Sequence, residues 1–145
     1  MSNKIKRVLI LCTGNSARSQ MAEGLLRCDG GEAFVVESAG LDPSSVRPEA
    51  VAVMRELGID ISSQRSKSLA EFLQQSFDYV ITVCDNANQH CPMFAGVARR
   101  VHWSIRDPAR TMGDEPTRLQ AFREARDELR KLLREFIAAE KRAAG

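Results

Sequence analysis

The sequence Arg7-Val8-Leu9-Ile10-Leu11-Cys12 is followed directly by Thr13-Gly14-Asn15-Ser16-Ala17-Arg18-Ser19. The first stretch is a short apolar run typical of a buried strand, and a helical pattern begins after the second stretch. In such a turn the backbone N–H groups of residues 13–18 can converge on one point, and the following helix directs the positive end of its dipole there. The sequence therefore predicts a strand, an anion-binding loop and a helix. We call residues 12–18 the cradle.

Two reactive side chains bracket the cradle. Cys12 is expected beneath a bound tetrahedral oxyanion, with the two-pronged Arg18 cation beside the anion. Because N–H dipoles, a helix N-terminus and a guanidinium all favour thiolate, we expect a lowered pKa for Cys12. Ser19 is placed to donate a hydrogen bond to this sulfur, and Gly14 and Asn15 tolerate left-handed backbone. The pattern indicates a nucleophile held against its substrate. The alternative is an ordinary strand-to-helix turn that happens to hold a cysteine.

The composition fits a single domain spanning residues 1–145, since 43% of the residues are hydrophobic and 28% are charged. Twenty-one Lys and Arg against nineteen Asp and Glu leave a formal charge of +2, which gives no sign of nucleic-acid or membrane binding. The first apolar run is shorter than the ~7 to 15 residues of a signal peptide, and no run reaches the ~18 of a membrane span. We therefore expect a cytoplasmic protein, in which cysteines serve catalysis or metal binding more often than structural disulfides.

Hydrophobic periodicity predicts strands alternating with helices. The expected strands are 7–12, 33–39, 77–83 and 99–103, and the expected helices are 20–27, 48–57, a short 69–73 and a long one from 117 onwards. Residues 84–96 show no clear period. This order predicts an α/β fold with a four-stranded, mostly parallel sheet and helices on both faces. Ligands in such folds bind beyond the carboxyl ends of the strands, where Cys12, Cys84 and the loop of Asp107 can meet.

Cys84 and Cys91 form a second signal. Their seven-residue separation spans about 10.5 Å along a helix, whereas a disulfide needs Cα atoms within about 7 Å. A bond between them would therefore require the polar segment 85–90 to refold. One alternative is a buried strand-end cysteine and an unrelated loop thiol. Another is a zinc site that also uses His90 and His102, although this spacing matches no standard structural zinc site.

The run from Cys12 to Gly24 closely resembles the cradle of low-molecular-weight protein tyrosine phosphatases, and it is more similar still to their relatives, the thioredoxin-coupled arsenate reductases. The likeness covers nearly the whole chain. It continues at Glu37-Ser38-Ala39-Gly40, Ile59-Asp60-Ile61-Ser62, Cys84 with Cys91-Pro92, His102-Trp103 and Asp107-Pro108.

This resemblance implies the reduction of arsenate to arsenite by a three-cysteine relay. The Cys12 thiolate attacks arsenic while Asp107 acts as general acid. Cys84 then attacks the Cys12 sulfur and expels arsenite, and Cys91 attacks Cys84. Thioredoxin reduces the final disulfide, so it is the expected partner and source of electrons, and no bound cofactor is expected. Phosphate or sulfate should mimic arsenate in the cradle.

The resemblance also assigns supporting roles. Asn15 and Ser38 should form hydrogen bonds beneath the cradle, although Ser38 has the alternative of a locally satisfied strand-end hydroxyl. Cys28 matches nothing in the family's chemistry and is expected to pack on its helix. Several family members bind potassium through a carboxylate at the position of Lys67, so we expect the ammonium to replace the ion, or no metal to bind. The alternative for Lys67 is a solvated surface lysine.

Two competing functions remain open. A phosphatase needs only Cys12, Arg18 and Asp107, but phosphatase relatives usually follow Asp-Pro with an aromatic residue, and this chain has Ala109. A weak phosphatase side activity is compatible with that difference. The other candidate is a non-catalytic oxyanion-binding or redox-sensing module that partners thioredoxin. The two histidines, at 90 and 102, are expected to form local hydrogen bonds rather than to act in catalysis.

Overall fold

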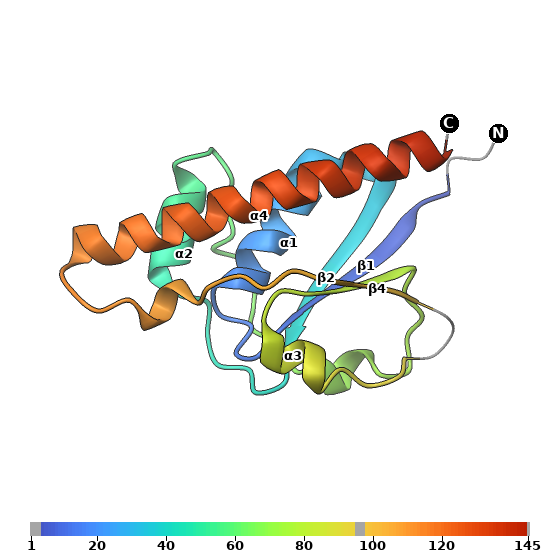
Figure 1. Cartoon of the computed structure of the whole chain (residues 1–145), viewed down its shortest axis with the longest axis horizontal. Helices are drawn as coiled ribbons and strands as arrows, with labels where there is room; N and C mark the ends of the chain where they lie inside the picture. Colours follow the sequence, from blue (N-terminus) through green and yellow to red (C-terminus); the bar gives the residue numbers. More distant parts are fainter. Residues whose placement is uncertain (1–3, 95–97, 145) are drawn as a thin grey trace.

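The computed structural model describes residues 4–94 and 98–144, and within these ranges four parallel strands form one sheet (Figure 1). The strands are β1 Lys6–Cys12, β2 Phe34–Gly40, β3 Tyr79–Thr82 and β4 Arg99–His102, in the spatial order β2-β1-β3-β4. The predicted fold class is confirmed. Residues 95 and 96, at the end of the segment expected to be irregular, lie outside the described residues.

Strand β1 is the centre of the sheet because it pairs with β2 on one side and β3 on the other. Val8 to Leu11 are completely buried, as expected for a parallel strand that is covered on both faces. The register sets Cys12 opposite Gly40, and the N–H of Val83 donates to the carbonyl of Leu11 at 3.0 Å. The residues that follow β1 and β3 therefore emerge together at one edge of the sheet.

Helices α1 Arg18–Gly30 and α4 Glu115–Ala144 pack against each other on one side of the sheet, and the shorter α2 Pro48–Arg55 contacts both (Figure 1). The connection after β3, which holds the short helix at residues 85–89, crosses the sheet in the direction opposite to the connection after β1, so the right-handed crossover rule places it on the other face. Ion pairs fix α4 in place: Arg130 and Arg134 both pair with Asp29 near the end of α1, at 2.9 and 3.2 Å.

Two details differ from the sequence expectations. A helix α3, Asp85–Gln89, occupies the segment without visible periodicity, because five residues are too few to display a 3.6-residue period. Cys28 was expected to pack on its helix, but it is exposed. The prediction was wrong because the buried part of α1 ends at Leu26, two residues before Cys28. The expected short helix at 69–73 is a 3-10 helix, Leu69–Phe72.

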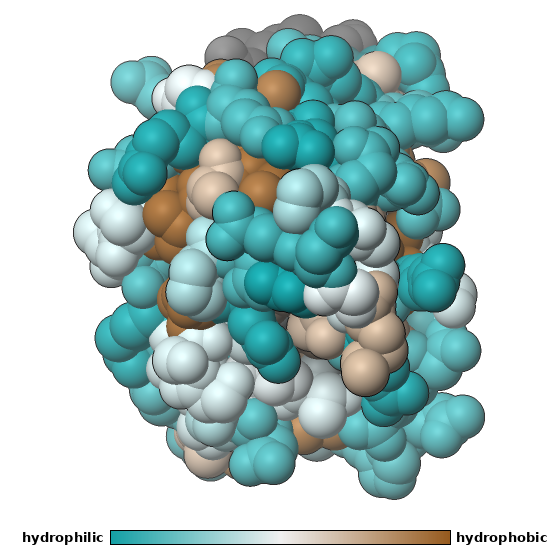
Figure 2. Space-filling view, turned by 90° about the vertical axis from the view of Figure 1, so that its left-hand side faces the viewer, coloured by the Kyte–Doolittle hydropathy of each residue, from teal (hydrophilic) through white to brown (hydrophobic). Residues whose placement is uncertain are grey.

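The surface is predominantly hydrophilic on the face shown in Figure 2, where apolar side chains form only small patches between charged ones. Within residues 4–94 and 98–144, no helix combines the length and the apolar composition needed to cross a membrane.

Gly40→Ala tests the close approach of β2 to the cradle. A Cβ atom at residue 40 would lie 2.6 Å from the Thr13 carbonyl oxygen and 2.9 Å from the Asn15 nitrogen, and backbone atoms cannot move aside as a side chain can. We expect the free energy of unfolding, measured in urea, to fall by about 2 to 3 kcal/mol. Gly14→Ala is the matched control, since its methyl group would meet no atom closer than Ser16 Oγ at 3.4 Å, which is ordinary van der Waals contact. Equal stability of the two variants would contradict the prediction.

Candidate active site at the carboxyl edge of the sheet

The backbone of the cradle is oriented by the loop that follows β2. The carbonyls of Cys12, Thr13, Gly14 and Ser16 accept hydrogen bonds from the N–H groups of residues 41, 42, 44 and 47, at 2.9 to 3.3 Å. In a trans peptide unit the carbonyl and the next N–H point in opposite directions. The N–H groups of residues 13, 14, 15 and 17 are therefore turned toward the inside of the cradle, as an anion-binding loop requires.

The buried side chain of Asn15 holds the turn in this shape. Asn15 has a φ of 47° and is completely buried. Its amide nitrogen donates to Ser19 Oγ at 2.7 Å and Ser38 Oγ at 2.9 Å, and its amide oxygen accepts from the Lys67 N–H at 2.8 Å and from Gln20 Nε2 at 2.9 Å. The expected left-handed residue is thus Asn15. Gly14 was also considered for this conformation, but it does not have a positive φ.

Ser19 has a different partner from the expected one. Its hydroxyl accepts the hydrogen bond from Asn15, and no hydrogen bond joins Ser19 to Cys12 within the described ranges. The prediction was wrong because the buried amide of Asn15 needs an acceptor at this place. Ser19 therefore supports the turn rather than the sulfur.

A buried group of charges lies behind Asn15. Ser38 donates to Glu23 Oε1 at 2.5 Å, and the Lys67 ammonium lies 3.5 Å from the same oxygen and 3.6 Å from Glu37 Oε1. Glu23 also pairs with Arg27 at 2.8 Å. Lys67 is only 6% exposed, so the alternative of a solvated surface lysine is wrong. Glu23 was not predicted as a site residue, although a carboxylate on the apolar face of a helix could have indicated a buried ion pair.

A pocket of about 480 Å³ opens in front of the cradle. It is lined by Thr13, Arg18, Cys84, Asp85, Asn86, Arg106, Asp107 and Arg110. Arg18 Nη1 donates to the Ile105 carbonyl at 2.8 Å, which fixes the guanidinium at the pocket wall. Its Nε is buried and has no hydrogen-bond partner within the described chain. A buried donor left without an acceptor indicates a place for an anion.

Asp107 lies on the other wall of this pocket. Its Oδ2 is 3.6 Å from Arg18 Nη2 and 3.8 Å from Arg110 Nε, while its Oδ1 accepts a hydrogen bond from the Ala109 N–H at 3.0 Å. One carboxylate oxygen is thus anchored by the backbone, and the other faces the pocket beside Arg18. This position suits an acid that protonates an oxygen leaving the cradle.

Cys12 and Cys84 form a coupled pair of thiols. Cys12 is 3% exposed, directly behind the pocket lining, and Cys84 lies beside it at the end of the neighbouring strand. The hydrogen bond with Cys84 and burial raise the pKa of Cys12, against the opposing effect of Arg18. The pKa of Cys84 is lowered to about 5, chiefly because Cys12 donates to it, and further by the Thr13 hydroxyl and the Ala87 N–H. The pKa of Cys12 is thus raised where a lowered pKa was expected, because the neighbouring Cys84 sulfur and burial outweigh the effect of Arg18.

Cys91 does not share the pocket. It is half-buried beyond α3, its Sγ lies 3.7 Å from the Pro92 carbonyl oxygen, and burial raises its pKa. The folded helix between Cys84 and Cys91 separates the two sulfurs, so they can bond only if α3 unwinds. The segment that must refold, as the spacing of Cys84 and Cys91 predicts, is therefore helix α3.

The two histidines make local hydrogen bonds, as expected. His90 Nδ1 lies 2.9 Å from the Asn86 carbonyl, and both ring nitrogens of His102 are engaged by neighbouring side chains. Among residues 4–94 and 98–144, no three His, Cys, Asp or Glu side chains gather closely enough to hold a metal ion. The zinc alternative built on Cys84, His90, Cys91 and His102 therefore has no geometric support.

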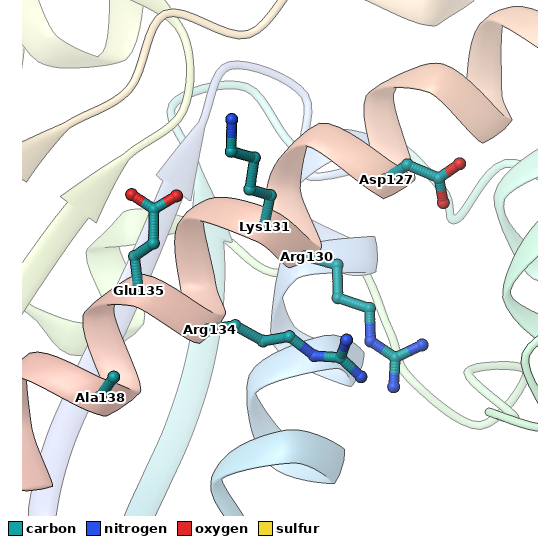
Figure 3. A pocket seen from close by; sticks show the side chains of 6 residues that line it. All are labelled: Asp127, Arg130, Lys131, Arg134, Glu135 and Ala138. Atoms are coloured by element: carbon teal, nitrogen blue, oxygen red, sulfur yellow. The ribbon is translucent and has the colours of Figure 1, made fainter.

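A second hollow lies along α4, and Figure 3 shows its charged lining. Its volume is about 490 Å³, and it is lined by Asp127, Arg130, Lys131, Arg134, Glu135 and Ala138. Arg130 and Arg134 are already paired with Asp29, and none of the residues expected at the site lies here. This hollow is a gap between surface side chains.

Comparisons with known proteins agree with this geometry. The family described as low molecular weight phosphotyrosine protein phosphatase matches residues 7–144. An arsenate reductase of Bacillus subtilis (strain 168) is 43% identical over 136 residues, which cover 94% of this chain and 96% of the relative.

Solved structures of arsenate reductases are also similar to this chain. A structure of an arsenate reductase in the phosphate binding state aligns with a TM-score of 0.81 and 34% identity, covering 93% of this chain and 98% of the other. A thioredoxin-dependent arsenate reductase of Corynebacterium glutamicum aligns with a TM-score of 0.70 and 27% identity, covering 97% of this chain and 65% of the other.

Cys12→Ala tests the coupling of the two thiols. We expect the pKa of Cys84 to rise from about 5 toward the ordinary 9.0, because the largest stabilising contribution to its thiolate is lost. The measurement is the pH dependence of thiolate ultraviolet absorbance in a background where Cys28 and Cys91 are serine. Cys12→Ser keeps a hydroxyl donor and should raise the pKa less. An unchanged Cys84 titration in Cys12→Ala would disprove the coupling.

Proposed function

The chain belongs to the low molecular weight phosphotyrosine protein phosphatase family, and we propose that it uses this fold to reduce arsenate to arsenite. The observation that carries the proposal is the position of Cys84, which follows the strand paired with β1 and whose Sγ lies 3.3 Å from the hydroxyl of Thr13, the residue after Cys12. Hydrolysis of a phosphate ester needs one nucleophilic sulfur, whereas reduction of arsenic(V) needs a second sulfur to take up the oxidation. The names of the relatives and neighbours support the same activity.

Arsenate binds in the cradle as a tetrahedral anion. The inward N–H groups of residues 13, 14, 15 and 17 and the unpartnered Nε of Arg18 supply its hydrogen bonds. Phosphate and sulfate have the same shape and charge type and should compete for the site. The solved neighbour in a phosphate binding state supports this expectation.

The first chemical step joins Cys12 to arsenic. Cys12 loses its proton, which the neighbouring Cys84 sulfur can accept, and the Cys12 thiolate attacks arsenic(V). Asp107, which lies 3.6 Å from Arg18, protonates the departing oxygen so that it leaves as water. The product is a Cys12–arsenic(V) adduct held by the cradle.

The second step reduces arsenic. Cys84, again deprotonated, attacks the Cys12 sulfur; a sulfur–sulfur bond forms, and the electron pair of the sulfur–arsenic bond stays on arsenic, which leaves as arsenite. The pairing of β1 with β3 supports this attack, because Cys12 and Cys84 follow the paired residues at the same edge of the sheet. The protein is left with a Cys12–Cys84 disulfide.

The third step carries the disulfide outward. The Cys91 thiolate attacks Cys84, α3 unwinds, and Cys12 is released as a thiolate for the next cycle. The Cys84–Cys91 disulfide is then reduced by thioredoxin, a source of electrons supported by the thioredoxin-dependent neighbour. A coupled assay with arsenate, thioredoxin, thioredoxin reductase and NADPH tests this, with glutaredoxin and glutathione in a parallel arm.

The phosphatase alternative has less support from the pocket. None of the described residues that line it is aromatic, and Ala109 stands where phosphatase relatives place a ring. A weak activity on aryl phosphates is still compatible with Cys12, Arg18 and Asp107. The non-catalytic module predicts oxyanion binding without NADPH consumption, so the coupled assay separates it from the reductase.

Lys67 supplies the positive charge behind the cradle. The oxygens of Glu23 and Glu37 that a potassium ion would need are already engaged by the ammonium, at 3.5 and 3.6 Å. The residues present therefore do not fit a bound ion, and Lys67 replaces it.

Serine substitutions of the relay cysteines test the proposed function. In Cys84→Ser no second sulfur can attack Cys12, so arsenite release should stop. In Cys91→Ser each protein should release one arsenite and then retain a Cys12–Cys84 disulfide, visible by mass spectrometry after peptide digestion. Cys28→Ser is the matched control and should keep the full steady-state rate, because Cys28 is exposed on α1. Sustained turnover in the first two variants would refute the relay.

Lys67→Gln tests the internal cation. Removing one partner of a buried ion pair should lower the free energy of unfolding by roughly 3 kcal/mol. Added potassium should restore part of this loss in the variant and leave wild-type activity unchanged. Urea unfolding in potassium chloride and in choline chloride measures the difference. The exposed Lys131→Gln is the control. Activation of the wild type by potassium would argue against the replacement.

A further inference from the structure

The imidazole of His102, the last residue of β4, lies between the sheet and α3. Its Nδ1 is 2.8 Å from Thr82 Oγ1, and its Nε2 is 3.0 Å from Asp85 Oδ1. One neutral tautomer satisfies both contacts, with Nε2–H donating to Asp85 and Nδ1 accepting from the Thr82 hydroxyl. His102 therefore ties the first residue of α3 to the end of β3.

Further contacts hold α3 against the sheet edge. Asn86 Nδ2 donates to Thr13 Oγ1 at 3.0 Å. Thr82 Oγ1 also lies 3.3 Å from Asn88 Oδ1, so the single Thr82 proton is donated either to this oxygen or to His102 Nδ1. Within α3, the Ala87 N–H donates to Cys84 Sγ at 3.4 Å, so the sulfur caps the helix. Helix α3 thus supports the Cys84 sulfur in the second step, and the same helix must unwind in the third step.

We propose that His102 is a positioning residue, a latch that keeps α3 folded while Cys84 attacks Cys12 and that opens when Cys91 attacks Cys84. This rests on the proposed relay. In the step that the latch controls, the Cys91 thiolate forms a bond with the Cys84 sulfur, the Cys12–Cys84 bond breaks, and Cys12 leaves with the electron pair. The proton lost from Cys91 goes to solvent. No oxidant or reductant is consumed.

The latch predicts opposite effects on two successive steps. Without it, α3 caps Cys84 less often, so formation of the Cys12–Cys84 disulfide should slow. The unwound form is reached more easily, so transfer of the disulfide to Cys91 should accelerate. A general loss of stability would not change the two rates in opposite directions. For a partly exposed hydrogen bond to a carboxylate, each change should be roughly threefold to tenfold.

The test is a single-turnover experiment on His102→Ala with arsenate and no thioredoxin. Acid quenching followed by alkylation and mass spectrometry resolves the Cys12–Cys84 and Cys84–Cys91 disulfides over time. His102→Gln retains an amide donor and should recover part of both rates. Arg99→Ala, at the opposite end of β4, is the matched control and should leave both unchanged. Parallel slowing of both steps, or no change in either, would overturn the latch.

A measurement without arsenate separates this proposal from the relay. Hydrogen exchange at the amides of Ala87 and Asn88 in the reduced protein should be roughly threefold to tenfold faster in His102→Ala. Asp85→Ala should also speed exchange, and the effect of the double variant should be smaller than the sum of the two single effects, because both substitutions remove the contact between His102 and Asp85. Faster hydrogen exchange without any disulfide transfer would reject the relay but would keep the conclusion that His102 holds α3 folded. Unchanged exchange would reject the latch alone.

Discussion

The site depends on the buried amide of Asn15. The cradle must turn its N–H groups inward, and this requires a left-handed residue at a point where the chain is already buried on all sides. The Asn15 side chain makes that conformation stable by joining Ser19, Ser38 and the Lys67 backbone, which belong to three different segments. A glycine could adopt the same φ but could not make these bonds, so the turn would lose its attachment to β2 and to the segment before β3.

Charge is distributed on both sides of this turn. In front of it, Arg18 offers a buried donor, and the thiolate of the Cys12–Cys84 pair lies close by. Behind it, Lys67 is enclosed by Glu23 and Glu37. Charges interact strongly where water is excluded, so the ion pairs of Lys67 with Glu23 and Glu37 hold the backbone of the turn in place. These charges are already paired, so they do not compete with Arg18 for the anion bound in the cradle. The cradle therefore has a set of buried contacts that does not involve the anion.

Helix α3 faces the opposite requirement, since it must be stable enough to cap Cys84 yet short enough to unwind. Five residues provide little helical stability of their own, because nucleation outweighs the few bonds formed. Contacts from Thr13, Thr82 and His102 supply what the segment lacks. A helix that depends on a few side-chain contacts can open without disturbing the sheet, which suits the outward transfer of a disulfide.

The sequence by itself determined the order of strands and helices, the anion-binding loop between Cys12 and Arg18, and the meeting of Cys12, Cys84 and Asp107 at one sheet edge. These follow from local periodicity and from the rules of parallel sheets, which act along the chain. The tertiary structure alone decided the exposure of Cys28, the burial of Lys67 and the opposite pKa shifts of Cys12 and Cys84. Each of these depends on atoms that are distant in sequence, and hydrogen bonds, burial and pKa values are set by those neighbours rather than by residue type.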